Sequence, residues 1–186
     1  MSENNIFGFH SSFYYFGLEH LVLNMYNYVR DGISKNEKIY VCMAPKVYRE
    51  LMKYVLDTYE CTDIENFSAS KIINCYKELR PDEVKLKFSR HIDEINKDGY
   101  KAVRFIVQTD YMILSTSRED FLNFNRAMLN IISGLRASFM CLYDFEDYLN
   151  AKHTIDDKVI LESYKIHPYR LYNGKLQNWY KLSHSK

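Results

Sequence analysis

The sequence predicts an α/β fold: a three-layer, mainly parallel sheet with helices on both faces, followed by a C-terminal β-hairpin. Three observations support this prediction. Short, continuously apolar segments recur along the chain, as expected for strands that are covered on both faces. Longer segments with apolar residues at helical spacing separate them. Near the C-terminus, Asn173-Gly174 lies between two extended segments, and Asn-Gly is a strong signal for a tight hairpin turn.

The individual elements follow from these patterns. Strands are expected at 6–15, Lys38–Met43, near Asn66–Ala69, Ala102–Val107 and Ala137–Tyr143, and in a hairpin of Tyr169–Tyr172 and Leu176–Tyr180. Helices are expected at Leu18–Ile33, 45–59, 81–99, 117–133 and Asp156–Lys165. Pro45 and Pro81 suit the first helical turn, where the missing N–H is not needed. Segment 61–80 is the least regular, and it is either a lid over a pocket or a packed connection.

The length and composition fit one domain spanning 1–186, with frayed tails at 1–5 and 181–186. A chain of 186 residues with 47% hydrophobic content can bury one core but is too short for two ordinary domains. The 25 basic and 24 acidic residues give a net charge of +1, which provides no overall attraction to nucleic acid or acidic membranes. We therefore expect neither direct nucleic-acid binding nor membrane association.

The cysteines give no sign of a metal centre. Cys42, Cys61, Cys75 and Cys141 show neither a CxxC motif nor Cys/His spacing typical of zinc sites. They are typical of reduced thiols in a cytoplasmic protein, and no apolar segment approaches the roughly 20 residues that span a bilayer. No metal and no cofactor are predicted.

The first strand-to-helix junction, 10–19, lies where a nucleotide-binding α/β domain carries its phosphate loop. Such a loop needs several glycines and then a Lys and a Ser or Thr. Here Gly17 stands alone, no Lys follows it, and aromatic residues precede it. The sequence therefore predicts a domain whose binding end serves something other than phosphate transfer.

Ligands of parallel sheets usually bind beyond the carboxyl ends of the strands. This rule nominates six ligand-binding residues: Tyr14, Tyr15, Gln108, Asp110, Tyr143 and Asp144. A seventh candidate, His10, lies at the start of the first strand, and the family resemblance described below places it near the pocket. His10 could contact a ligand or bond to a neighbouring carbonyl. Asp110 lies where a nucleotide-binding α/β domain holds Mg²⁺, but without a phosphate loop a solvated loop or helix-capping role is favoured. Asp144 could orient a ligand or cap a turn. Because adjacent strand residues face opposite sides, at most one of Tyr14 and Tyr15 is expected to line a pocket.

Several short motifs also occur in a characteristic order. They are Gly8-Phe9-His10, Phe13-Tyr14-Tyr15, Arg30-Asp31-Gly32-Ile33, Glu37-Lys38-Ile39-Tyr40-Val41, Gly99-Tyr100-Lys101, Cys141-Leu142-Tyr143-Asp144, His167-Pro168 and Asn173-Gly174. In this order they resemble the MEDS domain, the methanogen/methylotroph DcmR sensory family, from Gly8 almost to Tyr180. The chain departs from that family at Phe9, Gln108 and Asn125, where the family has acidic residues. The loss of these carboxylates removes candidates for metal binding and general-base catalysis.

The resemblance implies a degenerate RecA/KaiC-like fold and a sensory domain that binds a small organic ligand without converting it. It also implies a signalling partner, a histidine kinase or a transcription regulator, reached through protein–protein contact, with a homodimer as a further option. Two alternatives remain open. One is an atypical nucleotide-binding, ATPase-like protein of the same ancestry. The other is a pure protein-interaction module whose pocket is filled by side chains.

Overall fold

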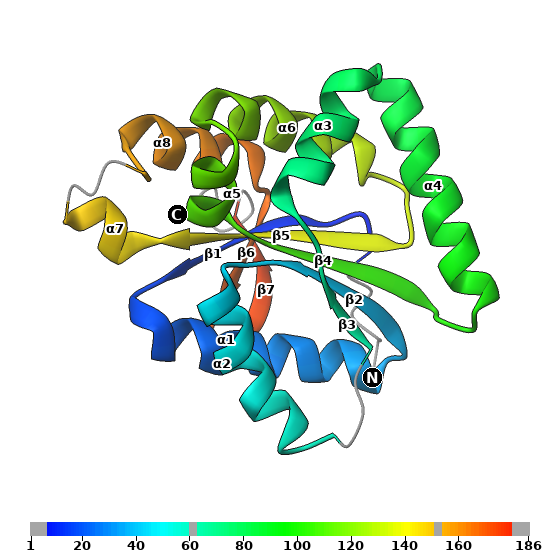
Figure 1. Ribbon diagram of the computed structural model, residues 1–186, viewed down its shortest axis with the longest axis horizontal. Helices are drawn as coiled ribbons and strands as arrows, with labels where there is room; N and C mark the ends of the chain where they lie inside the picture. Colours follow the sequence, from blue (N-terminus) through cyan, green and yellow to red (C-terminus); the bar gives the residue numbers. More distant parts are fainter. Residues whose placement is uncertain (1–6, 60–62, 151–153, 180–186) are drawn as a thin grey trace.

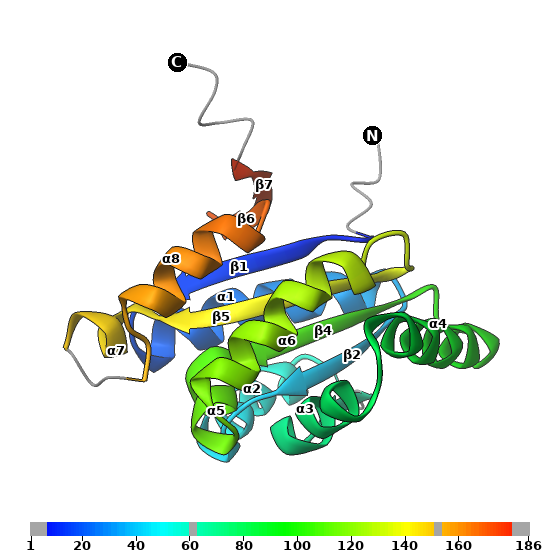
Figure 2. The same ribbon diagram turned by 90° about the horizontal axis from the view of Figure 1, so that it is seen from above.

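The computed structural model describes residues 7–59, 63–150 and 154–179. The tails predicted at 1–5 and 181–186, and also Cys61, lie outside the described residues. One sheet runs through the molecule, with strands in the order β3-β2-β4-β5-β1-β6-β7 (Figures 1 and 2). Its strands are β1 (His10–Tyr15), β2 (Glu37–Cys42), β3 (Ile64–Asn66), β4 (Ala102–Gln108), β5 (Ala137–Asp144), β6 (Tyr169–Tyr172) and β7 (Lys175–Asn178).

The predicted fold class is confirmed. All neighbouring strands described here pair in parallel except β6 and β7, which form the expected antiparallel hairpin. Asn173 and Gly174 make its turn with positive φ values of 47° and 70°, a conformation that Asn and Gly tolerate. Helices cover both faces of the sheet, as Figure 1 shows.

Two helices pack on one face: α1 (Gly17–Ser34) and α2 (Pro45–Leu56). The other face carries α3 (Ala69–Glu78), α4 (Pro81–Lys97), α5 (Thr109–Ser115), α6 (Arg118–Ile131) and α8 (Asp157–Ile166). The short α7 (Phe145–Leu149) follows the carboxyl end of β5 (Figure 1). Within the described residues, no helix combines the length and the apolar character that crossing a bilayer requires.

The sequence prediction was wrong in segment 61–80 and incomplete after β4 and β5. The strand expected near Asn66–Ala69 ends at Asn66, and Ala69 already begins α3. The apolar residues of α3 are few, so their helical spacing is hard to recognise: Ala69 and Ile73 are its buried residues. Helices α5 and α7 were missed because each follows its strand directly and has seven residues or fewer.

A buried arginine joins the sheet to α1. Arg104 of β4 is fully buried, and its Nε donates to the carboxylate of Glu37 at the start of β2. Its Nη1 donates to the carbonyl of Tyr28 at 2.7 Å, and its Nη2 donates to Asp31 at 2.6 Å. Gly32 leaves room for this group, because a Cβ at that position would lie 2.8 Å from the Arg104 Nε. Two of the sequence motifs, 30–33 and 37–41, thus contribute to one structural ion-pair network.

Candidate ligand-binding site

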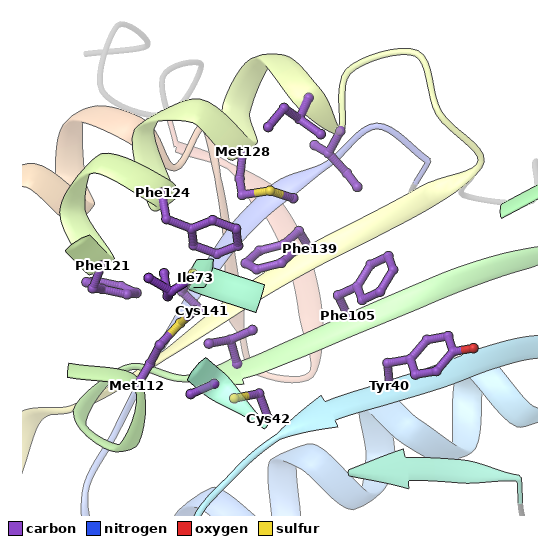
Figure 3. Close-up of a cluster of buried hydrophobic side chains, with 14 of the residues drawn as sticks. Tyr40, Cys42, Ile73, Phe105, Met112, Phe121, Phe124, Met128, Phe139 and Cys141 are labelled. Carbon is purple, nitrogen blue, oxygen red and sulfur yellow. The ribbon is translucent and has the colours of Figure 1, made fainter. Parts of the chain in front are cut away.

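A row of aromatic side chains crosses the sheet on the face that carries α3 and α4. Tyr40, Phe105 and Phe139 are register partners on the neighbouring strands β2, β4 and β5. The ring centroids of Tyr40 and Phe105 lie 5.5 Å apart, and those of Phe105 and Phe139 lie 6.1 Å apart. Figure 3 shows the three rings side by side above the strands. Such a row forms an apolar surface, which suits the apolar part of a ligand.

Above this row the structure is hollowed by a cleft of about 750 Å³ between α3 and α4. Its apolar lining is dominated by rings and comprises Tyr40, Phe67, Ile72, Tyr76, Val84, Phe88, Phe105, Phe124 and Phe139. Pockets for small organic molecules have volumes of roughly 300 to 1,000 Å³ and are mostly apolar. In both size and lining, the cleft resembles such a pocket.

The rim of the cleft is charged. Five side chains from exposed residues surround it: Glu65, Lys71, Lys87, Arg90 and Glu94. Three of them are basic and two are acidic, so the rim carries a net positive charge. An apolar floor below a cationic rim favours a molecule with an apolar body and a polar or anionic end.

Few polar groups point into this apolar space. The hydroxyl of Tyr40 lies 3.1 Å from Nε2 of His91, on α4. Burial, together with the charge of Glu65, raises the pKa of Tyr40 to about 12, so the phenol stays neutral. The thiol side chain of Cys75, which is half-buried on α3, also lines the cleft. These groups could fix the orientation of a ligand, whereas the rings would supply its contact area.

The seven residues nominated from the sequence do not form one site. Tyr15, Gln108 and Asp110 meet at the carboxyl end of the sheet. The amide Nε2 of Gln108 donates to Asp110 at 3.0 Å and to the Tyr15 hydroxyl at 3.3 Å. Its Oε1 accepts from the backbone N–H of Ala44 at 3.0 Å. The amide at the end of β4 is therefore bonded both to the end of β1 and to the residue that precedes α2.

Two aspartates make this edge of the sheet acidic. Burial raises the pKa of Asp110 to about 6, and the charges of Asp144 and Asp147 act in the same direction. Burial also raises the pKa of Asp144, although backbone N–H groups oppose the shift. The Asp144 side chain accepts from the N–H groups of Glu146 and Asp147, so it caps α7, which is one of the two roles expected for it.

The remaining nominated residues lie on the opposite face from Tyr15. The hydroxyl of Tyr14 lies 2.6 Å from that of Ser163 on α8, which confirms that Tyr14 and Tyr15 face different sides. His10 and Tyr143 belong to a buried cluster with Cys141, and neither lines the large cleft. Burial lowers the pKa of His10 to about 4, although the Asn125 side chain and the Ile166 carbonyl favour protonation.

The junction between β1 and α1 is very short. Phe16 alone separates Tyr15 from Gly17, and its N–H donates to Nδ1 of His20 at 3.0 Å. A Cβ on Gly17 would lie 3.5 Å from the carboxylate of Glu146. The start of α1 therefore faces a carboxylate at the place where a phosphate loop would present N–H groups to an anion.

The profile of the family described as MEDS, "MEthanogen/methylotroph, DcmR Sensory domain", matches residues 9–168. The chain belongs to the MEDS family. This membership confirms the resemblance drawn from the motifs, and it supports a sensory or regulatory role. No curated protein matches the sequence.

Several of the similar solved structures come from Pyrococcus horikoshii. The uncharacterized protein PH0321, in complex with an unknown peptide, has a TM-score of 0.53 and 9% identity, with 91% of this chain and 81% of that chain covered. PH0250 has a TM-score of 0.51 and 10% identity, with 91% and 85% covered. The KaiC-like protein PH0186 follows at a TM-score of 0.46 and 12% identity, with 91% and 76% covered. At these identities the likenesses to PH0321 and PH0250 concern the fold alone.

Sequence reasoning missed the large cleft because its residues come from separate segments. Tyr40, Phe105 and Phe139 lie in strands that the sequence does predict, yet their strand register could not be known beforehand. The walls of the cleft come from α3, which the sequence did not predict, and from α4. The high aromatic content, 16% of all residues, was the available signal.

Proposed function

We propose that this MEDS domain senses a small organic molecule by binding it in the aromatic cleft between α3 and α4, and that it does so without catalysis. The observation that carries the proposal is the aromatic row of Tyr40, Phe105 and Phe139, which leaves about 750 Å³ of apolar space above it. In a packed core, side chains would fill such a space. The seven residues nominated from the sequence remain a separate ligand-binding prediction.

The geometry also favours a ligand class. The rings offer stacking faces to a planar or aliphatic body, while Lys71, Lys87 and Arg90 at the rim can attract an anionic end. The position of α3 supports the role of a lid, which is one of the two roles considered for segment 61–80. Because Ile72, Cys75 and Tyr76 of α3 wall the cleft, movement of this helix could open or close it.

A nucleotide-dependent activity is less well supported. One residue connects β1 to α1, too little backbone to wrap a triphosphate, and Glu146 lies close to Gly17. Anionic phosphates would be repelled there by the carboxylates of Glu146, Asp144 and Asp110. We therefore expect no heat of binding when Mg²⁺ and ATP are titrated into the protein in a calorimeter, and saturable binding would revive the ATPase-like alternative.

The signal is proposed to leave through contact with a second protein, a histidine kinase or a transcription regulator. The sensory character of the family supports such an output, and the cationic rim and α3 are the parts that a ligand would rearrange first. A purified candidate partner should bind the protein with an affinity that changes on addition of the ligand. Equal affinity with and without the ligand would contradict this output.

Thermal unfolding tests the binding site. The protein should be screened against small aromatic and aliphatic molecules, each with and without a carboxylate. A ligand at 100 times its Kd stabilises the folded state by about 2.7 kcal/mol, which corresponds to a rise in Tm of roughly 5 to 10 °C for a domain of this size. The variant Ile72→Trp places an indole in the cleft and should lose the response.

A matched control separates this effect from a general change in stability. Leu23→Trp introduces the same side chain on α1, where Leu23 is 61% exposed on the opposite layer. This variant should respond like the wild type. If Ile72→Trp still responds fully, or if no compound in the screen stabilises the wild type, the aromatic cleft is not the sensory site.

A further inference from the structure

Three potential metal ligands meet in the interior, away from the aromatic cleft. His10 lies at the start of β1, Cys141 in β5, and His167 directly after α8. All three are fully buried, and one ligand atom from each lies within 4.8 Å of the others. Because the residues are far apart in the sequence, the spacing of cysteines and histidines could not reveal the cluster.

The orientation of His167 is the second observation. Its Nδ1 lies 2.8 Å from the carbonyl of Ser163, which identifies Nδ1 as the protonated nitrogen. The lone pair of Nε2 is then free, and Nε2 has no hydrogen-bond partner among the described residues although it is buried. Metal-binding histidines typically donate their second N–H to a carbonyl in this way.

The other two ligands lie close by. Nε2 of His10 is 4.0 Å from the Sγ of Cys141, and the centroids of the His10 and His167 rings are 4.3 Å apart. The Cys141 thiol lies 3.2 Å from Oδ1 of Asn125, whose Nδ2 donates to the Tyr143 hydroxyl at 3.0 Å. Metal–nitrogen and metal–sulfur bonds of about 2.0 and 2.3 Å require the ligand atoms to approach by about 1 Å.

We propose that His10, Cys141 and His167 form a buried binding site for a Cu(I) ion. The donor set of one thiolate and two imidazoles matches the preference of this soft ion. On binding, the Cys141 thiol loses its proton to solvent and its sulfur bonds to the metal, without any change of oxidation state. The bound ion would link β1, β5 and the residue that follows α8.

The charge balance selects Cu(I) over Zn(II). One thiolate and two neutral imidazoles neutralise a monovalent ion, whereas Zn(II) would leave a buried complex with a net positive charge. A neutral complex is therefore the more stable one here.

The test is an anaerobic titration of the protein with Cu(I) in the presence of an equimolar amount of bathocuproine disulfonate. A background with Cys61→Ser and Cys75→Ser removes two other thiols. We expect this protein to retain one Cu(I) per chain, and X-ray absorption should show one sulfur and two nitrogen neighbours. Adding Cys141→Ser should abolish retention. Retention of Cu(I) by the Cys141→Ser variant would overturn the proposal.

A second measurement avoids the risk that a substitution at Cys141 disturbs folding. Cu(I) is diamagnetic, so the imidazole ¹⁵N resonances of the unsubstituted protein can be followed during the titration. Binding should shift Nε2 of His167 and a nitrogen of His10, while His20 on the surface of α1 should not respond. If neither buried imidazole shifts, the site does not bind Cu(I). Ligand binding in the aromatic cleft is unaffected by either result, because none of the three residues lines the cleft.

Discussion

Replacing Asp110 with asparagine should stabilise the protein at neutral pH. The carboxyl of Asp110 is largely buried beside Tyr15 and Gln108, and its pKa is raised from 3.8 to about 6. Because the pKa is higher in the folded state, folding favours the protonated form. The stability that Asp110 contributes is therefore greatest below pH 4 and is lost as the pH rises through 6.

The size of this effect follows from the shift. A difference of about two pKa units corresponds to roughly 3 kcal/mol at pH 7.5, at 1.36 kcal/mol per unit. The asparagine side chain would remain neutral and could keep the bond to Gln108. We expect Asp110→Asn to gain about 1 to 3 kcal/mol at pH 7.5 and roughly 2 kcal/mol less at pH 4.5, because pH 4.5 still lies above the unfolded-state pKa of 3.8.

Urea denaturation at pH 4.5, 6.0 and 7.5 measures this difference. The buried His10, which must gain a proton on unfolding in acid, affects both proteins equally and cancels. Asp93→Asn, at an exposed position on α4, serves as the matched control and should change stability little at any pH. If Asp110→Asn destabilises the protein at pH 7.5, or if its effect does not vary with pH, the reasoning about this carboxyl is refuted.

Three further predictions concern packing and polar contacts. Arg104→Met should reduce the free energy of unfolding by about 3 to 5 kcal/mol in urea denaturation, because it leaves the buried Glu37 carboxylate without its partner. Adding Glu37→Leu should recover much of this loss. A double variant that recovers none of it would contradict the ion-pair account. Gly32→Ala should lower stability by about 1 to 3 kcal/mol, because its Cβ would lie 2.8 Å from the Arg104 Nε, and this loss should shrink in the Arg104→Met background. Tyr14→Phe removes the 2.6 Å contact with Ser163 and should lower stability by about 0.5 to 1.5 kcal/mol; an unchanged urea midpoint would show that this contact is not stabilising.

The sequence predicted the layers of the fold well because the central strands are buried on both faces. Strands β2, β4 and β5 are mostly apolar and buried along nearly their whole length, and α1, α4 and α6 carry apolar residues at clear helical spacing. The hairpin turn was predicted from Asn173-Gly174, since few other residue pairs adopt positive φ so readily. Short helices such as α5 and α7 lack the length over which periodicity can be recognised.

The candidate sites were harder to predict because they depend on distances between strands. The rule for parallel sheets placed Tyr15, Gln108 and Asp110 at the edge where the carboxyl ends of the strands converge, and these three side chains do meet there. A ligand site at this edge stays a prediction. It could not reveal the aromatic row, which requires the register of β2 against β4 and β5. Nor could it reveal that α3 and α4 leave a cleft between them above this row.

The alkylation rate of Cys75 provides the most direct test of ligand binding in the aromatic cleft. Cys75 lines the cleft from α3, whereas Cys42 and Cys141 are buried, so a Cys61→Ser variant leaves Cys75 as the accessible thiol among the described residues. Reaction with N-ethylmaleimide, followed by intact mass, should slow at least about tenfold with a stabilising compound at 100 times its Kd, in line with the small fraction of unoccupied sites. A compound that raises the Tm but leaves the Cys75 rate unchanged would contradict binding in the cleft.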